Sequence, residues 1–349
     1  MRVFRNQVAS LLAATLLLLT SVGWSQDKIL APQGEVYEPL SADCDDCEPW
    51  CNLCPCRYVV VEGLLMDRNN QAINQPLVIN LNTQQTLYSA GNLNPDLGAG
   101  FRIYGGMRLN ECWGFELGYF GLFGQSANAS VILEDQLTTP GDIGLGPVNN
   151  FFGADRFDIA YTSQIQGAEA NWVLCNCDQD CHSVEWLAGF RYLNLSEMAS
   201  LTSFDSLEGS STYRVRTQNH LFGAQVGSRL RRCYGQWSLE GTGKAGIFGN
   251  DATQNSDAIL DFPNNFVFRP ATSASQGQVA FVGELNLSAI YQISQVWGLR
   301  AGYNLLWVEG VALAPDQFDF SNTPTSGTAI ASNGGVFMHG LSAGVEARW

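Results

Sequence analysis

Apolar and polar residues alternate along ten segments of this chain, each about ten residues long. A period of two is typical of β-strands, because successive side chains of a strand point to opposite faces. Within 296–308, for example, Trp297, Leu299 and Tyr303 share one face, and Arg300 lies on the other. The pattern predicts strands at residues 57–66, 98–109, 112–123, 159–174, 183–193, 220–231, 235–248, 278–293, 296–308 and 337–349.

The segment 159–174 does not keep one phase. Ile159 and Tyr161 occupy odd positions, whereas Ala168 and Trp172 occupy even positions. An extra residue in a strand reverses its two faces, so this switch predicts a β-bulge or a shorter strand.

The connections between the segments alternate between long and short. Long stretches such as 67–97 and 194–219 are followed by short turns such as 110–111 and 294–295. Outer-membrane barrels have this asymmetry, with short periplasmic turns and long external loops. A closed barrel also leaves no unpaired strand edge in lipid. The expected fold is therefore all-β, an antiparallel transmembrane β-barrel of about ten strands.

Two further apolar stretches leave the strand number open. Residues 77–81 and 130–133 have strand composition but lie within expected loops. They either extend neighbouring strands or add a hairpin, which would make twelve strands.

The N-terminus has the features of an export signal. Arg2 and Arg5 precede an apolar run over 8–22, and Gly23 and Ser25 are small residues before a cut at Gln26. The alternative is a membrane anchor, but the run is shorter than the roughly 20 residues that a spanning helix needs. The expected organisation is a signal peptide at 1–25, a periplasmic Cys-rich segment at 26–56 and an outer-membrane barrel at 57–349.

The last predicted strand ends on an aromatic residue, Trp349. A terminal aromatic resembles the signal that barrel insertion machinery recognises in outer-membrane proteins. That machinery and outer-membrane lipid are therefore the expected partners.

These features together carry a family resemblance. The exported chain has a Cys-rich mature N-terminus, a first strand reading YVVVEGLL at 58–65 and a Gly-rich strand reading GGMRL at 105–109. It resembles the β-barrel porins of type seven over nearly the whole mature chain. The resemblance implies a pore and brings no catalytic residues.

The cysteines fall into two groups, one in the N-terminal segment and one beside the first three short turns. In the expected topology all are periplasmic, where disulfides form. The alternative is metal, because Cys44-x2-Cys47 and Cys51-x2-Cys54 have zinc-like spacing. Export favours disulfides, so no metal or cofactor is expected. The disulfide candidates are Cys44, Cys47, Cys51, Cys54, Cys56, Cys112, Cys175, Cys177, Cys181 and Cys233.

Charged residues of the predicted strands lie mostly opposite the apolar face. A charge facing lipid costs roughly 2–4 kcal/mol at mid-membrane, so we expect these side chains inside the barrel. The residues expected to line the lumen are Glu62, Arg102, Arg108, Glu116, Glu185, Arg191, Arg229, Glu240, Lys244, Glu284, Arg300, Glu346 and Arg348.

Two functions remain open from the sequence. In a wide barrel, rows of opposite charge would line water, and the acidic loops would make the protein a cation-leaning porin or small-solute channel. In a narrow barrel the charges would pair and fill the interior, leaving a structural or adhesion barrel whose loops bind a surface partner. Solvation and bridging by divalent cations are the alternative explanation of the acidic loops. The net charge of −15 argues against nucleic acid.

The sequence favours no enzymatic activity. Hydrolysis at the external rim would need a base, and only His220 and His339 begin strands near that rim, with Asp205 or Asp316 as conceivable neighbours. Nothing in their spacing requires such a contact. Phosphate-binding glycine loops, haem attachment sites and dinucleotide fingerprints are absent.

Overall fold

The computed structural model describes residues 55–349 with the exception of 71, 111, 144–149, 178–181, 207–208, 263 and 265. The expected signal peptide and nearly all of the Cys-rich segment lie outside the described residues. Both remain predictions.

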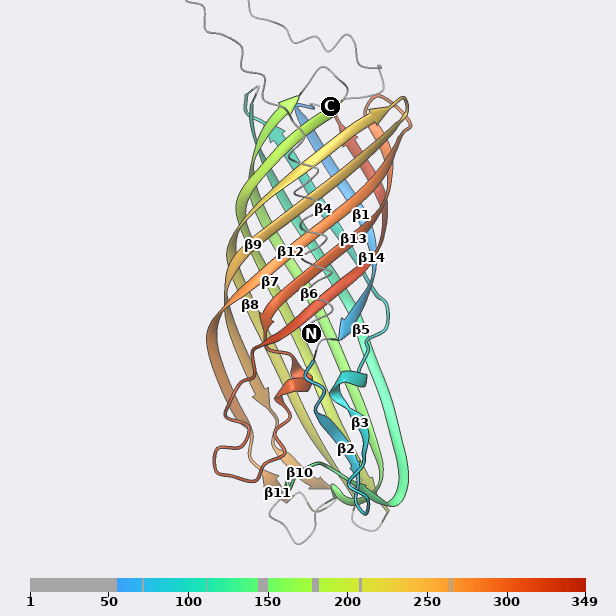
Figure 1. Cartoon of the computed structure of the whole chain (residues 1–349), viewed down its shortest axis with the longest axis vertical. Helices are drawn as coiled ribbons and strands as arrows, with labels where there is room; N and C mark the ends of the chain where they lie inside the picture. Colours follow the sequence, from blue (N-terminus) through green and yellow to red (C-terminus); the bar gives the residue numbers. More distant parts are fainter. Residues whose placement is uncertain are drawn as a thin grey trace, which may run out of the picture. The chain divides into compact units, whose positions relative to one another are not determined.

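Ten strands form one closed antiparallel barrel (Figure 1). Each strand pairs with the next along the chain, and β14 pairs with β1 over thirteen registered residues, which closes the sheet. This confirms the expected all-β barrel and its ten strands. The barrel strands are β1 (Arg57–Asn70), β4 (Gly98–Arg108), β5 (Trp113–Thr138), β6 (Phe152–Cys177), β7 (His182–Asp205), β8 (Gly209–Tyr234), β9 (Trp237–Ser256), β12 (Thr272–Gln292), β13 (Trp297–Val311) and β14 (Gly334–Arg348).

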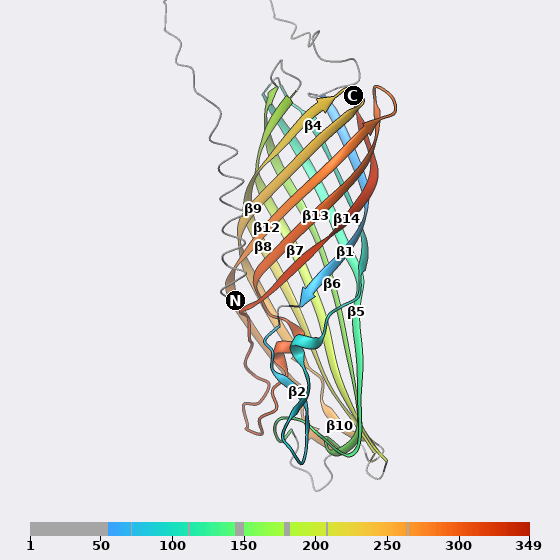
Figure 2. The same ribbon diagram turned by 45° about the vertical axis from the view of Figure 1, so that its right-hand side comes forward.

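Short elements gather at one end of the barrel, the lower end in Figures 1 and 2. We call this the loop end and the opposite one the turn end. The elements are β2 (Pro76–Asn80), β3 (Thr86–Ser89), η1 (Ala90–Asn92), β10 (Ile259–Phe262), β11 (Val267–Arg269) and η2 (Ala314–Gln317). Most of the stretch 77–81 thus does form a strand, β2, which lies off the closed barrel path, while 130–133 belongs to β5. Among the described residues, no helix is long and apolar enough to span a membrane.

The turn end has the short connections expected from the sequence. Residues 235–236 alone join β8 to β9, and Gly235 has a φ of 60°, a left-handed conformation that favours glycine. The amide of Trp349 donates to the carbonyl of Arg57, 3.0 Å away, and the Arg57 amide donates back over 2.8 Å. The first and last strands are therefore joined up to the final residue.

The long loops are much shorter than the sequence pattern implies. The expected loop 194–219 is almost entirely strand, because β7 runs to Asp205 and β8 begins at Gly209. Figures 1 and 2 show β5 to β8 continuing past the ends of β1 and β14. The sequence pattern predicted loops there because the apolar and polar faces exchange sides along continuous strands, which interrupts the alternation.

Strand β6 shows this reversal. Tyr161 and Glu169 both point inward, and the register with β7 is unbroken from Arg156 to Cys177. The bulge or shorter strand expected within 159–174 is therefore wrong: the strand keeps its phase while the polarity of its two faces exchanges. A bulge does occur on the neighbouring β5, where Gly124 has a φ of 72°.

The exchange divides the barrel into two halves. In the lipid half the outward side chains are mainly apolar, and this half comprises 57–66, 98–123, 166–193, 221–249, 278–308 and 337–349. The remainder, 67–97, 124–165, 194–220, 250–277 and 309–336, we call the extension. Its outward side chains are mainly polar and its inward ones mainly apolar.

Candidate functional site

Ion pairs fill the interior of the lipid half. Seven glutamates face seven cations there, and each of these side chains has an opposite charge within 4.0 Å and is at most 13% exposed. The formal charges cancel. The members of this ion-pair layer are Glu62, Glu116, Glu169, Glu185, Glu240, Glu284, Glu346, Arg102, Arg191, Arg229, Arg231, Lys244, Arg300 and Arg348.

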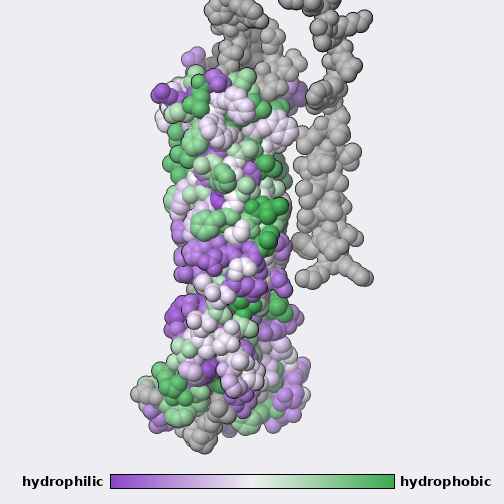
Figure 3. Space-filling model, turned by 90° about the vertical axis from the view of Figure 1, so that its left-hand side faces the viewer, coloured by the Kyte–Doolittle hydropathy of each residue, from purple (hydrophilic) through white to green (hydrophobic). Residues whose placement is uncertain are grey.

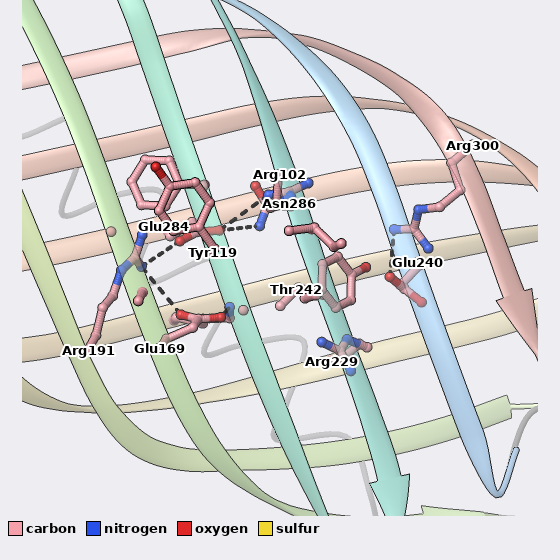
Figure 4. A pocket seen from close by; sticks show the side chains of 17 residues that line it. Arg102, Tyr119, Glu169, Arg191, Arg229, Glu240, Thr242, Glu284, Asn286 and Arg300 are labelled. Carbon is pink, nitrogen blue, oxygen red and sulfur yellow. Dashed lines mark hydrogen bonds and ion pairs between the residues drawn. The ribbon is translucent and has the colours of Figure 1, made fainter.

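Arg300 on β13 lies at a junction of the ion-pair layer. Its guanidinium donates to Glu346 over 2.7 Å, to Glu240 over 2.8 Å and to Glu62 over 3.2 Å. These acceptors come from β14, β9 and β1, so one side chain links several strands across the interior. Figure 4 shows Arg300 directed at Glu240.

A second cluster surrounds Glu284 on β12. Arg191 donates to this carboxylate over 2.6 Å, and Arg102 reaches its other oxygen over 3.4 Å (Figure 4). Lys244 pairs with the nearby Glu169. Charges buried in a low-dielectric interior are costly unless paired, and this arrangement pairs each of them with an opposite charge.

A third cluster lies nearer the turn end. Arg229 contacts Glu116 over 2.6 Å and Glu185 over 2.7 Å, and the hydroxyl of Tyr58 also donates to Glu116. Arg108, which the sequence also placed in the lumen, is half-buried here and lines a small pocket with Tyr58 and Glu185.

Little space remains between these side chains. The cavity in Figure 4, lined by Arg102, Arg191, Arg229, Lys244, Arg300 and three glutamates, has a volume of about 30 Å³. A buried water needs roughly 10–15 Å³, so this cavity has room for about two waters. The charges fill the interior here instead of bordering a water-filled channel.

An apolar layer follows toward the loop end. Inward side chains from the barrel strands pack with Leu313, which follows β13, into one buried cluster, in which Leu122, Leu193 and Met338 have no exposed surface. The layer consists of Leu64, Met66, Leu122, Ile165, Leu193, Leu195, Leu221, Phe248, Ala280, Val282, Leu306, Val308, Val311, Leu313, Val336 and Met338.

Beyond the apolar layer lies a buried ion pair that the sequence interpretation missed. Arg68 donates to Glu197 over 2.6 Å, and neither side chain has exposed surface. Ser163 also accepts a hydrogen bond from Arg68. Both charged residues stood in expected loops, and only the continuation of β1 and β7 brings them inside.

The connection between β13 and β14 closes the extension from within. The side chain of Asn219 bonds the carbonyl and the amide of Ala312, both over 2.8 Å. Gln278 donates to the carbonyls of Gly310 and Ser332, each 2.7 Å away. Side chains of β8 and β12 thus hold the segment 312–333, which we call the inner loop.

Asp316 in η2 belongs to the inner loop and is buried. Its carboxylate accepts a hydrogen bond from the amide of Ile73, 2.7 Å away. Burial, opposed by the hydrogen bond from the Ile73 amide and assisted by the nearby carboxylate of Glu197, raises the pKa of Asp316 to about 7. Protonation of Asp316 therefore stabilises the inner loop in its position inside the barrel, which we call the seated loop.

Sequence reasoning left Glu169 and Arg231 out of the lumen set. Glu169 belongs to the segment 159–174, whose change of phase left its inward face undecided in the sequence. Arg231 ends the predicted strand 220–231 two residues after Arg229, so the alternation places both on the same face. In the structure Arg231 is buried and contacts Glu346 over 2.6 Å.

The described cysteines lie at the turn end. Cys56, Cys112 and Cys175 carry free thiols, and Cys233 is disulfide-bonded. Cys44, Cys47, Cys51, Cys54 and Cys181 and the side chain of Cys177 lie outside the described residues. The disulfide connectivity therefore stays a prediction, and the structure does not pair Cys56, Cys112 or Cys175. Among the residues that are described, no group of three or more His, Cys, Asp and Glu side chains has metal-binding geometry.

The two rim histidines are bound to tyrosines on the outer surface. His220 contacts the hydroxyl of Tyr192 over 2.8 Å, and His339 contacts that of Tyr303 over 2.9 Å. Asp205 pairs with Gly209, far along β8 from His220, and Asp316 faces the Ile73 amide. The geometry therefore does not assemble the His–Asp pairs considered from the sequence.

Comparison with known proteins identifies a family. The model of the family described as Putative beta barrel porin-7 (BBP7) matches residues 148–349. Curated proteins give no match.

Solved outer-membrane barrels show a similar fold at low identity. The outer-membrane protease OmpT from Escherichia coli is 10% identical with a TM-score of 0.44, covering 84% of this chain and 96% of its own. A major outer membrane protein from Thermus thermophilus is 10% identical with a TM-score of 0.34, and the match covers 84% of this chain and 99% of that protein. The channel CymD is 10% identical with a TM-score of 0.37, and the match covers 85% of this chain and 89% of CymD.

Proposed function

We propose that this chain, which belongs to the β-barrel porin-7 family and resides in the outer membrane, acts as a closed barrel whose working part is the extension. The barrel anchors the protein in lipid. The extension stands outside the cell as a folded platform that binds a surface partner. Short turns face the periplasm in such barrels, which assigns the loop end to the exterior.

The observation that carries this proposal is the filling of the interior by successive layers. A solute travelling through the barrel would meet the ion-pair layer, the apolar layer, the Arg68–Glu197 pair and then the inner loop. Permeation would require breaking buried, mutually neutralised ion pairs, and removing one partner of such a pair typically costs about 3–5 kcal/mol.

The extension has a hydrophobic core of its own, which a set of flexible loops would lack. Residues of β2, β6, β7 and β8 pack together with the inner loop, and Phe157, Tyr213 and Leu201 have no exposed surface in that cluster. A surface held by a packed core keeps its shape, and binding to a rigid surface loses less conformational entropy. This supports a binding role for the loop end.

The cation-leaning channel is the second candidate. Its support is the acidic surplus of the loop end, exemplified by the exposed Glu134 and Asp135, which would concentrate cations at a mouth. This function requires a water path through the ion-pair layer. We rank it below the closed barrel because the cavity in that layer is so small. We propose no catalytic activity.

Planar-bilayer conductance of the refolded protein tests the closed barrel. Insertion is verified by protease protection and by heat-dependent migration in gels, with a general porin as the positive control. We expect inserted protein without stable current steps. Reproducible steps with a cation-biased reversal potential would overturn the closed barrel and support the channel.

A further inference from the structure

Exposed apolar side chains reappear at the far tip of the extension. The hairpin of β10 and β11 carries Leu260, Phe262, Phe266 and Val267, which are 43%, 64%, 56% and 47% exposed. Exposed apolar side chains gathered in this way on a soluble surface mark interaction sites more often than isolated ones do.

The strand register extends this apolar row across the sheet. Phe262 is paired with Ser210, and Ser210 with Phe204 on β7. Phe204 is in turn paired with Arg156, and Arg156 with Ile132 on β5, which is 73% exposed. We call this surface the tip face: Ile132, Phe204, Leu260, Phe262, Phe266 and Val267.

A polar belt separates the tip face from the lipid half. Outward positions of β5, β6 and β7 in between include Asn128, Ser130, Thr162 and Ser196, and Arg216 on β8 pairs with Asp257. In Figure 3, hydrophilic residues lie between the green barrel wall and a second green area at the lower end. The tip face is therefore not a continuation of the lipid-facing surface.

Acidic groups border the tip face. Glu134 and Asp135 are exposed beside Ile132, and Asp155 accepts hydrogen bonds from the amides of Asp135 and Ser206. Arg156, the cation within the row, lies 4.1 Å over the ring of Phe204 and pairs with Asp158 over 3.2 Å. The surface is thus apolar along the row, with Arg156 paired to Asp158, and anionic at its Ile132 end.

We propose that the tip face docks a polypeptide segment in which apolar side chains are flanked by lysine or arginine. The aromatic side chains of the tip face supply the buried contact, and the acidic border pairs with the flanking cations. A second copy of this chain would bring the same acidic border into contact with itself. An anionic lipid surface would be repelled by that border.

This inference rests on the proposed function, because it names the chemistry of the partner. The probe is a phage-displayed library of random twelve-residue peptides, selected on the protein in nanodiscs after depletion on empty nanodiscs. We expect recovered peptides to be enriched in Lys and Arg together with apolar residues.

The variant Phe262→Ser/Phe266→Ser removes the two most exposed aromatic side chains of the tip face. We expect at least about tenfold weaker peptide binding, as for central aromatic contacts of an interface. The matched control Ile73→Ser/Leu87→Ser changes two exposed apolar residues of the same extension outside the tip face and leaves binding unchanged. Glu134→Gln/Asp135→Asn weakens binding several-fold at low salt and less at high salt.

Four results would overturn the docking surface. These are peptides without charge bias, equal binding to the Phe262→Ser/Phe266→Ser variant, recovery only on empty nanodiscs, and a dimer in sedimentation that this variant dissolves. Conductance in the bilayer experiment would overturn the closed barrel but would not bear on peptide binding at the tip face. The two failures are therefore distinguishable.

Discussion

The lipid half and the extension are built from the same continuous strands, yet their faces carry opposite chemistry. On β6 the lipid half directs Glu169 and Asn171 inward and Trp172 outward, whereas the extension directs Tyr161 inward and Thr162 outward. In lipid the apolar side chains belong outside and polar groups must find partners inside. In water the hydrophobic effect reverses this preference.

The two halves therefore close their interiors by different forces. The lipid half depends on geometry between buried charges, and removal of any one of them leaves a net charge in the interior. The extension depends on packing of apolar side chains, where the loss of stability increases with the side-chain volume removed. Substitutions that remove a buried charge or a buried apolar side chain therefore test the two halves separately.

Arg300→Met and a change in the core of the extension share the largest expected effect, and Arg300→Met acts on the lipid half. This change leaves Glu62, Glu240 and Glu346 short of a buried cation, which should lower the free energy of unfolding by about 3–5 kcal/mol. Urea unfolding in lipid vesicles measures it. The control Arg216→Met removes an ion pair with 45% and 39% exposed side chains and should cost less than about 1 kcal/mol. Equal losses would mean that the interior charges are solvated.

A loss of about 3–5 kcal/mol, confined to the extension, is expected from Phe157→Ala, whose side chain is fully buried in the hydrophobic core there. Proteolysis at the loop end should accelerate while the lipid half stays resistant to heat in gels. The exposed Thr162→Ala on the same strand serves as the control. Simultaneous loss of both halves would show that the extension does not unfold independently.

Two outward alanines of β6 test the boundary directly. Ala170→Lys places a charge against lipid between Leu117 and Phe190, at a cost of about 2–4 kcal/mol. Ala160→Lys places it between Asn128 and Ser200 and should change stability by less than about 0.5 kcal/mol. Refolding yield and unfolding in vesicles report both. Similar costs at both positions would place the membrane boundary elsewhere.

The smallest effect is expected from pH. The pKa of Asp316 is about 7 in the seated inner loop, above its ordinary value of 3.8, so seating is most stable below about pH 4 and weakens as pH rises toward 7. Between pH 6 and pH 8 the loss should be about 1–1.5 kcal/mol.

Hydrogen exchange of the inner loop measures this loss, expressed relative to Asp316→Asn at each pH to remove the intrinsic pH dependence of exchange. The asparagine retains an oxygen for the Ile73 amide. A ratio that stays constant with pH would show that Asp316 does not titrate in this range.

Alternation of residues determined most of the lipid half. The ten strands, their order, the short turns and the inward placement of Glu62, Arg102 and Glu284 all follow from a period of two combined with the cost of charge in lipid. The local pattern suffices there because each strand by itself contacts lipid on one face and the interior on the other.

Only the tertiary structure decided where the strands end and what closes the interior. The extension looked like loops because its polarity is reversed, and the sequence does not mark the plane where lipid gives way to water. The pairing of Arg68 with Glu197 and the seating of the inner loop join residues far apart in the chain. Such contacts depend on the diameter and stagger of the closed barrel, which no single strand encodes.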